Sequence, residues 1–212
     1  MYVVARDFGF APNPFHGYCT LATCKPRIRN KAGVNDWVIG MGGSKLKATG
    51  KCIFAMRVTE IITFDEYWIN PIFFDKKPII NGSRKMMVGD NIYHRNVVDN
   101  KWCQADSHHS KADGSTNLDN LRRDTNSDKV LLSHHFLYFG RGAQDVPCEL
   151  LNIIGYKNVR DYRVFDSNTT AINKLIEWLH DSFRVSLNQV TDDPSDFSKS
   201  EKRYDVNKDK IS

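Results

Sequence analysis

The sequence predicts an α+β fold with a β-rich core, peripheral helices and a C-terminal helix. Three observations lead to this class. Most apolar stretches are short and rich in β-branched or aromatic residues, as strands are. The longest strand-like run covers residues 51–62. An apolar period of three to four residues, which is typical of a helix, is sustained only over residues 169–183.

The first strand is expected at residues 2–5, a β-branched run. Residues 6–17 follow as an irregular loop, because their glycine and proline residues interrupt regular structure. This loop contains Phe8, Phe10 and Phe15. Aromatic side chains at such positions either fill the core or stack on a planar ligand.

Two further strands are expected on either side of a glycine-rich loop. Residues 37–39, Trp-Val-Ile, predict a buried strand after an Asn-Asp turn, and residues 40–45 interrupt it. This strand is expected to pair antiparallel with residues 51–62. The backbone amides of the loop and Lys45 could hold a phosphate. A plain hairpin connection is the alternative, because the loop lacks the Walker spacing and no helix pattern follows it.

The rest of the chain alternates short regular elements with polar stretches. A short helix is expected at residues 65–68, strands at 130–132 and 136–139, and the closing helix at 169–183. Between them, residues 76–113 are polar and rich in turn signals. Long irregular segments inside a compact domain are usually functional or disordered, and the aromatic and histidine residues here favour function. We therefore expect the site in this segment.

The 212 residues are enough for one core, and we expect a single globular domain at residues 1–185. Residues 186–212 alternate acids and bases and are expected to form a disordered tail. No apolar run approaches the roughly 18 residues of a membrane span. The N-terminus lacks the pattern of a signal peptide, so a cytoplasmic protein without a membrane partner is expected.

The five cysteines do not suggest a disulfide framework. Only Cys19 and Cys24 lie close together. Reduced thiols are the better interpretation, and neither a structural metal nor a cofactor is expected. The net charge of +5 comes with local basic clusters at residues 25–31, 45–51 and 84–85, which would tolerate a polyanionic partner.

Four strings in the sequence resemble a known family. They are residues 2–15, 17–26, 89–94 and 106–110. They are similar to the nucleotide modification associated domain 2 family, bacterial and phage proteins that are associated with DNA base modification. The resemblance covers residues 1–140 and implies a DNA-modification or phage-defence context, but it brings no mechanism with it.

A second likeness is to PUA-like barrels, including the EVE domains that read modified bases. The similarity is in the pattern of residues 54–60 after Asn35-Asp36, which stands where those barrels have Gly-Asp. This likeness implies an open barrel.

The leading hypothesis is the binding of a nucleotide or nucleic-acid base, with or without a modification. Such a site needs flat apolar faces, polar groups for the base edge and cations for phosphates. The candidate ligand-binding residues are Phe8, Phe10, Asn13, Phe15, Tyr18, Lys25, Trp37, Ser44, Lys45, Arg84 and Tyr93.

An enzyme that acts on nucleotides or DNA bases is the alternative. His94, Asp106, His108 and His109 could then supply acid–base groups, although surface or supporting roles are the plainer interpretation. If His108 and His109 lie on a strand, they point to opposite sides and at most one faces a site. A protein-interaction module is a third possibility, and the oligomeric state stays open.

Overall fold

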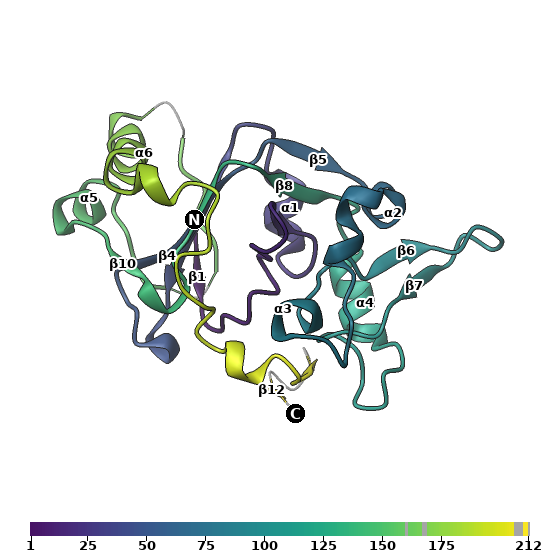
Figure 1. Ribbon diagram of the computed structural model, residues 1–212. Helices are drawn as coiled ribbons and strands as arrows, with labels where there is room; N and C mark the ends of the chain where they lie inside the picture. The colour runs from purple at the N-terminus through teal and green to yellow at the C-terminus, as the bar shows by residue number, and fades with distance from the viewer. Residues whose placement is uncertain (160, 167–168, 206–209, 212) are drawn as a thin grey trace.

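The computed structural model describes residues 1–159, 161–166, 169–205 and 210–211. Within these residues the strands form four sheets, two of which carry the core, and helices pack around them (Figure 1). This is the expected α+β class with a β-rich core. The described strands do not close into a barrel, so the PUA-like arrangement is not confirmed.

The larger sheet is built around its two longest strands. Its members are β1 (Tyr2–Val4), β3 (Trp37–Gly42), β4 (Lys51–Arg57), β9 (Phe136–Tyr138) and β10 (Gln144–Asp145). Strands β3 and β4 pair antiparallel, as predicted, and β1 pairs parallel to β3. The sequence Gly40-Met41 marks an irregularity in the β3–β4 register. A Cβ atom at Gly40 would lie 2.1 Å from the Phe54 ring, so only glycine fits there.

The predicted long strand at residues 51–62 is in fact two strands in two sheets. Strand β4 ends at Arg57, and β5 (Glu60–Ile62) joins β2 (Cys19–Leu21) and β8 (Val130–Ser133) in the order β2–β8–β5. The amide of Val58 donates to the Asp36 carbonyl, and the next amide, of Thr59, donates to the Leu132 carbonyl. The chain therefore leaves one sheet and enters the other within two residues, which periodicity alone does not show.

The predicted C-terminal helix is present as α6 (Thr170–Phe183). It covers the larger sheet together with α5 (Cys148–Ile153) (Figure 1). Leu175 and Leu179 of α6 are buried in the same apolar cluster as Ile39 and Leu137 of the sheet. The apolar stripe of the helix is thus explained by its packing on the sheet.

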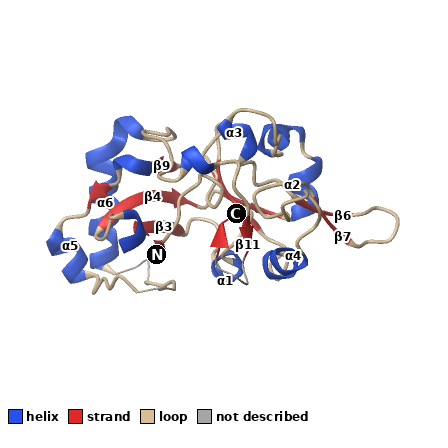
Figure 2. Ribbon diagram, turned by 90° about the horizontal axis from the view of Figure 1, so that it is seen from below, coloured by secondary structure: helices blue, strands red, loops and turns tan. Residues whose placement is uncertain are grey.

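The other half of the molecule holds the remaining helices and a hairpin. Its elements are α1 (Pro26–Lys31), α2 (Phe64–Ile69), α3 (Arg84–Met87), α4 (Leu118–Asp124), β6 (Tyr93–Arg95) and β7 (Trp102–Gln104). The β6–β7 hairpin extends away from the body (Figures 1 and 2). The short helix predicted at residues 65–68 is α2, and Thr63 and Glu66 form a capping box at its start. The segment 76–113, expected to be irregular, contains α3, β6 and β7.

Short 3-10 turns complete the described chain, together with a small two-stranded ladder near the C-terminus. The turns are η1 (Ser44–Leu46), η2 (Pro71–Lys76), η3 (Gly140–Gly142), η4 (Arg184–Ser186) and η5 (Phe197–Lys199), and the ladder pairs β11 (Tyr204–Asp205) with β12 (Lys210–Ile211). No helix among the described residues has the length and apolar character needed to span a membrane.

The expectation of a disordered tail from residue 186 is wrong for the described residues up to 205. The amide of Asn188 donates to the Phe136 carbonyl over 2.7 Å, and the amide of Thr191 donates to the Tyr138 carbonyl over 2.9 Å. Phe197 is only 6% exposed and stacks on Phe15. The composition of this segment predicted disorder, because the segment has few apolar residues. Its order comes instead from hydrogen bonds to the neighbouring strand β9. Residues 206–209 and 212 of the predicted tail lie outside the described residues.

Candidate active site

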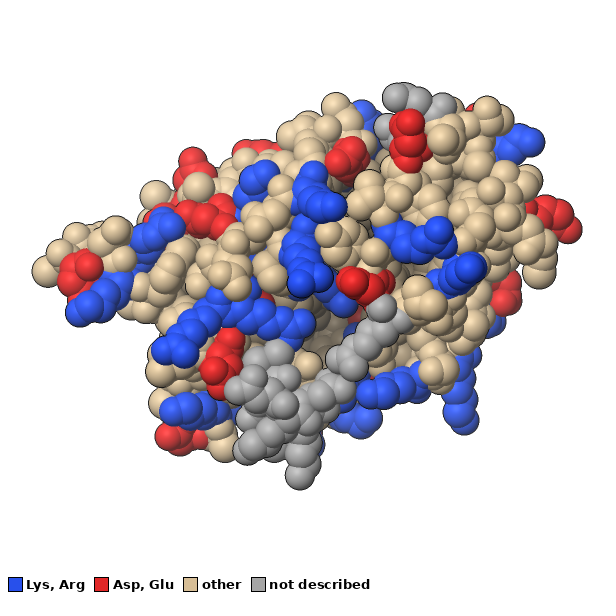
Figure 3. Space-filling model, turned by 180° about the vertical axis from the view of Figure 1, so that it is seen from behind, with Lys and Arg blue, Asp and Glu red and all other residues tan. Residues whose placement is uncertain are grey.

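The structure contains a cavity of about 510 Å³ next to strand β1. Its walls come from β1 and the loop after it, from the turn before α1, from the glycine-rich loop and from the turn after β7. The end of α4, the start of β11, and Asn158 and Asp161 after α5 complete the described lining. The side chains that line the cavity include Arg6, Phe8, Phe10, Cys24, Lys25, Ser44, Lys45, His108, His109, Arg123 and Tyr204. Lys and Arg side chains gather across the middle of the face seen in Figure 3.

Cys24 occupies a sharp turn between β2 and α1. Cys24 and Lys25 both adopt left-handed backbone conformations, with φ angles of 57° and 42°. Pro26 then begins α1, and its fixed φ angle suits the first position of a helix. Non-glycine residues rarely adopt the left-handed region, and such residues cluster at functional sites.

The buried side chain of Arg29 ties this turn to the end of α4. Its Nε donates to the Cys24 carbonyl over 3.0 Å, and its Nη2 donates to the Asp124 carbonyl. Its Nη1 donates to the carbonyls of Ser127 and Lys129. Arg29 is fully buried, so these bonds form away from competing water.

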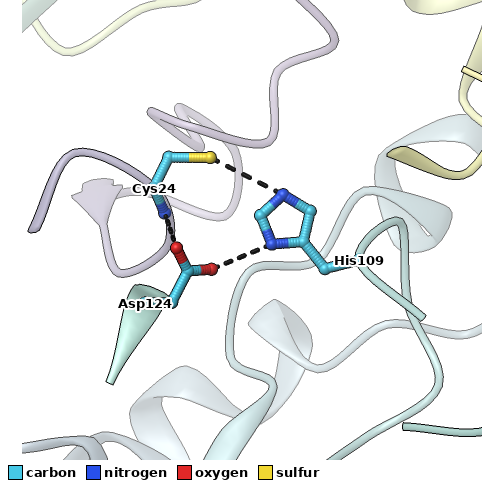
Figure 4. A group of neighbouring side chains, drawn as sticks. All are labelled: Cys24, His109 and Asp124. Atoms are coloured by element: carbon cyan, nitrogen blue, oxygen red, sulfur yellow. Dashed lines mark hydrogen bonds and ion pairs between the residues drawn. The ribbon is translucent and has the colours of Figure 1, made fainter. Parts of the chain in front are cut away.

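His109 lies between Cys24 and Asp124 (Figure 4). Its Nε2 is 3.6 Å from the Cys24 Sγ, and its Nδ1 is 2.9 Å from Oδ2 of Asp124. The other carboxylate oxygen of Asp124 accepts the backbone N–H of Cys24 over 2.9 Å. One carboxylate therefore positions both the imidazole and the backbone of the cysteine.

Burial and neighbouring charges fix the ionisation of this group. Burial alone would lower the pKa of His109, but Cys24 and the Asp124 carboxylate outweigh it and raise the pKa to about 10. Burial would raise the pKa of Asp124, but His109 and Arg29 outweigh it and lower that pKa. His109 is therefore an imidazolium and Asp124 a carboxylate at neutral pH.

Tyr93, at the start of β6, supports the same carboxylate. Its hydroxyl donates to Oδ2 of Asp124 over 3.0 Å. Burial and the adjacent Asp124 raise the pKa of Tyr93 well above its ordinary value, so the hydroxyl stays protonated and remains a donor.

A thiol, an imidazole and a carboxylate in this order can perform nucleophilic catalysis. The thiol is the nucleophile, the imidazole exchanges its proton, and the carboxylate orients the imidazole. The three ligand atoms also lie within 4.8 Å of one another, as a metal site would require. However, the two ring nitrogens of His109 face different partners, and one metal ion can take only one of them. The geometry suits a catalytic triad better than a metal centre.

The structure brings together some of the sequence-predicted residues. Those that line the cavity are Phe8, Phe10, Lys25, Ser44, Lys45, His108 and His109. His108 and His109 lie in a turn and not on a strand, which is why both rings reach the same cavity. Tyr93 is buried and is not among the described residues that line the cavity. Its hydroxyl contacts Asp124 and His109, which belong to the site.

Other predicted binding residues lie elsewhere. Phe15 and Tyr18 pack on Phe197 and Phe73, respectively. Buried Asn13 donates to the Val88 carbonyl and accepts from the Lys76 ammonium, so its amide group is used inside the fold. Trp37 lines a separate cavity of about 170 Å³, and Arg84 on α3 is absent from the described lining of the larger cavity.

Two of the predicted catalytic residues also lie away from the triad. His94 stacks on Trp68 with ring centroids 4.0 Å apart, and Asp106 forms an ion pair with Arg203. Neither is among the described residues that line the cavity.

Sequence reasoning missed Cys24 and Asp124 as site residues. They lie 85 and 15 residues from His109, so no local spacing links the three. The one available signal was a cysteine directly before Lys-Pro at the start of a helix, in a chain that also carries histidines and carboxylates.

Comparisons with known proteins agree with the resemblance noted in the sequence. A search of curated proteins and a search of solved structures each gave no match. A family model described as nucleotide modification associated domain 2 matches residues 1–201, which include all three residues of the triad and most of the described C-terminal segment. The chain therefore belongs to the nucleotide modification associated domain 2 family.

Proposed function

We propose that this protein is an enzyme that acts on a nucleotide through a covalent intermediate on Cys24. The observation that carries the proposal is the Cys24–His109–Asp124 arrangement at the wall of the large cavity. A domain that only bound its ligand would have no use for a thiol beside a charged imidazole and an orienting carboxylate. For this reason we favour the enzyme over the binding domain that the sequence alone suggested.

The family and the cavity both support a nucleotide as the substrate. The family description associates the domain with nucleotide modification. Phe8 and Phe10 offer the apolar faces on which a base can stack. Lys25, Lys45 and Arg123 place positive charge around the same cavity, which suits phosphate groups. A cavity of about 510 Å³ is within the range that small ligands occupy.

The chemistry follows from the resting state of the triad. In this proposal Cys24 reacts as a thiolate, the nucleophilic form of a cysteine, beside the imidazole of His109. The Cys24 thiolate attacks an electrophilic carbon of the substrate and forms a C–S bond. The bond between that carbon and its leaving atom breaks as the C–S bond forms, and His109 donates its proton to the leaving atom, which keeps the electron pair. Neutral His109 then takes a proton from water or from a second substrate, which attacks the same carbon and releases the thiolate of Cys24.

Thiol reactivity tests the proposal directly. The protein is treated with iodoacetamide between pH 5 and 9, and alkylation of each cysteine is followed by peptide mass spectrometry. Exposed Cys148 serves as the internal control. If Cys24 is the activated nucleophile, it should be alkylated about ten-fold or more faster than Cys148 at pH 6. Alkylation of Cys24 with the same pH dependence as Cys148 would refute an activated nucleophile.

Substrate turnover is the second measurement. The protein is incubated with a panel of plain and modified nucleotides, and both the products and the intact protein mass are analysed. We expect turnover of at least one nucleotide, with the loss of all turnover in Cys24→Ser and retention in Cys148→Ser. A product that forms equally well with Cys24→Ser would exclude the covalent route.

A further inference from the structure

The two adjacent histidines at the cavity differ in their chemistry. His109 belongs to the triad, whereas His108 has no contact with Cys24 or Asp124 in the described residues. The ring of His108 packs against the rings of Phe8 and Phe10, with centroid distances of 4.6 Å and 5.2 Å. His108 is thus part of the aromatic wall that we assign to the base of the substrate.

The tautomer of His108 follows from its hydrogen bond. Nδ1 of His108 bonds to the backbone carbonyl of Lys202. A carbonyl oxygen can only accept, so Nδ1 carries the proton and Nε2 carries a lone pair. Burial and the neighbouring positive charge of His109 lower the pKa of His108 to about 3, which agrees with a neutral ring.

Backbone contacts hold the ring in this state. The amide of Tyr204 donates to the His108 carbonyl over 2.8 Å, and Arg203 donates to the carbonyl of Ser107 over 2.8 Å. The segment around residues 202–204 therefore fixes both the position and the tautomer of His108. Such support from outside the site is what keeps a recognition group in one geometry.

Nε2 of His108 is an acceptor without a partner among the described residues. His108 lines the cavity, so a ligand there can reach this acceptor. A ligand in the cavity can supply the missing donor. At neutral pH, phosphate groups carry acceptors almost alone, whereas bases carry N–H donors on their edges. The phenyl rings that pack against His108 favour the planar base over the sugar as the source of the donor.

We propose that Nε2 of His108 accepts a hydrogen bond from an N–H group of the substrate's base and so selects the base. This inference rests on the proposed function, because it assumes a nucleotide in the cavity. It makes His108 a residue that determines specificity and leaves the chemical step to the triad. A base that carries a methyl group at the bonded nitrogen would bind less tightly, because it has no hydrogen to donate to Nε2 and its methyl group would occupy the place of the hydrogen bond.

The test compares matched pairs of ligands in a background that cannot turn over, Cys24→Ala. The probes are the four deoxynucleoside monophosphates and, for each, the counterpart whose base N–H groups are replaced by N-methyl groups. Dissociation constants are measured by calorimetry. We expect at least one parent nucleotide to bind about ten-fold more tightly than its methylated counterpart, the difference expected for one hydrogen bond to a buried group.

Two variants of His108 decide whether this residue is responsible. His108→Phe keeps a ring but removes the acceptor, so the ratio within each pair should fall to about two-fold or less. His108→Gln keeps an acceptor and should recover part of the ratio. Circular dichroism and thermal melting confirm that both variants fold.

The possible failures can be told apart. A ratio that survives in His108→Phe, or equal binding within every pair, overturns the role of His108 and leaves the nucleotide assignment intact. If none of the nucleotides binds, the nucleotide assignment fails together with this inference, whereas the alkylation of Cys24 still reports on the triad.

Discussion

Substitution of Arg29 by methionine is the most informative perturbation of the fold around the triad. Methionine fills a similar volume but donates no hydrogen bonds. Arg29 is fully buried and donates to the main-chain carbonyls of Cys24, Asp124, Ser127 and Lys129. In the variant these four carbonyls would lose their charged donor. The turn that presents Cys24 would also lose its tie to α4.

The magnitude follows from these bonds. A hydrogen bond to a charged group contributes about 1.5–3 kcal/mol, and an unsatisfied buried group costs about 1–3 kcal/mol. Some carbonyls will gain water or shift, so the sum is an upper bound. We expect Arg29→Met to lower the free energy of unfolding by about 4 kcal/mol, similar to the loss of one partner from a buried ion pair.

Urea denaturation measures this change, and Arg27→Met is the matched control. Arg27 lies in the same helix but is exposed, so its replacement should change the stability by less than about 0.5 kcal/mol. Alkylation of Cys24 at pH 6 should slow in Arg29→Met under conditions where the variant is still folded. If the two variants are equally stable, the view of Arg29 as the tie between the turn and α4 is incorrect.

Three further predictions concern stability. His108 has a pKa of about 3 in the folded protein and about 6.5 when unfolded, so it stabilises the fold fully above pH 6.5, and this stabilisation is lost as the pH falls. Between pH 7 and pH 5 the free energy of unfolding should fall by about 2 kcal/mol for this reason, and melts of His108→Gln at the same pH values should lack that decrease. Phe197→Ala should cost about 3 kcal/mol in denaturation experiments, because the ring is buried against Phe15; an unchanged stability would mean that this segment is not docked. Gly40→Ala should cost about 2 kcal/mol or more by thermal unfolding, since its Cβ would overlap the Phe54 ring, and a neutral effect would contradict the close approach of β3 and β4 at this point.

The sequence was sufficient for the local features of the fold. The apolar stripe of α6 and the pairing of β3 with β4 could be predicted because each depends on neighbouring residues and a turn between them. The break between β4 and β5 could not, because it is set by bonds from Val58 and Thr59 to strands far away in the chain. The order of residues 186–205 was missed for the same reason.

The candidate site shows this limit more sharply. Phe8 and Phe10 of the aromatic loop and the His108-His109 pair were proposed from residue type alone, and all four line the cavity, whereas Phe15 of the same loop packs on Phe197. Cys24 and Asp124 were missed, because a lone cysteine and a lone aspartate carry no signal until the fold brings them to His109. Conversely, His94 and Trp37 have the right residue types, but the packing around Trp68 and in the smaller cavity takes them elsewhere.

The way in which Arg29 binds has a consequence for sequence divergence. All its recorded hydrogen bonds go to main-chain oxygens, so they do not depend on which side chains stand at positions 127 and 129. Substitutions of Lys129, which is only partly buried, can therefore accumulate without removing these hydrogen bonds, whereas Ser127 is buried and leaves little room for a larger side chain. Position 29 has no such freedom, because no other side chain offers five donors from one rigid planar group. Selection on this part of the fold should therefore act on the donor at position 29 and spare Lys129, which supplies only a main-chain acceptor to it.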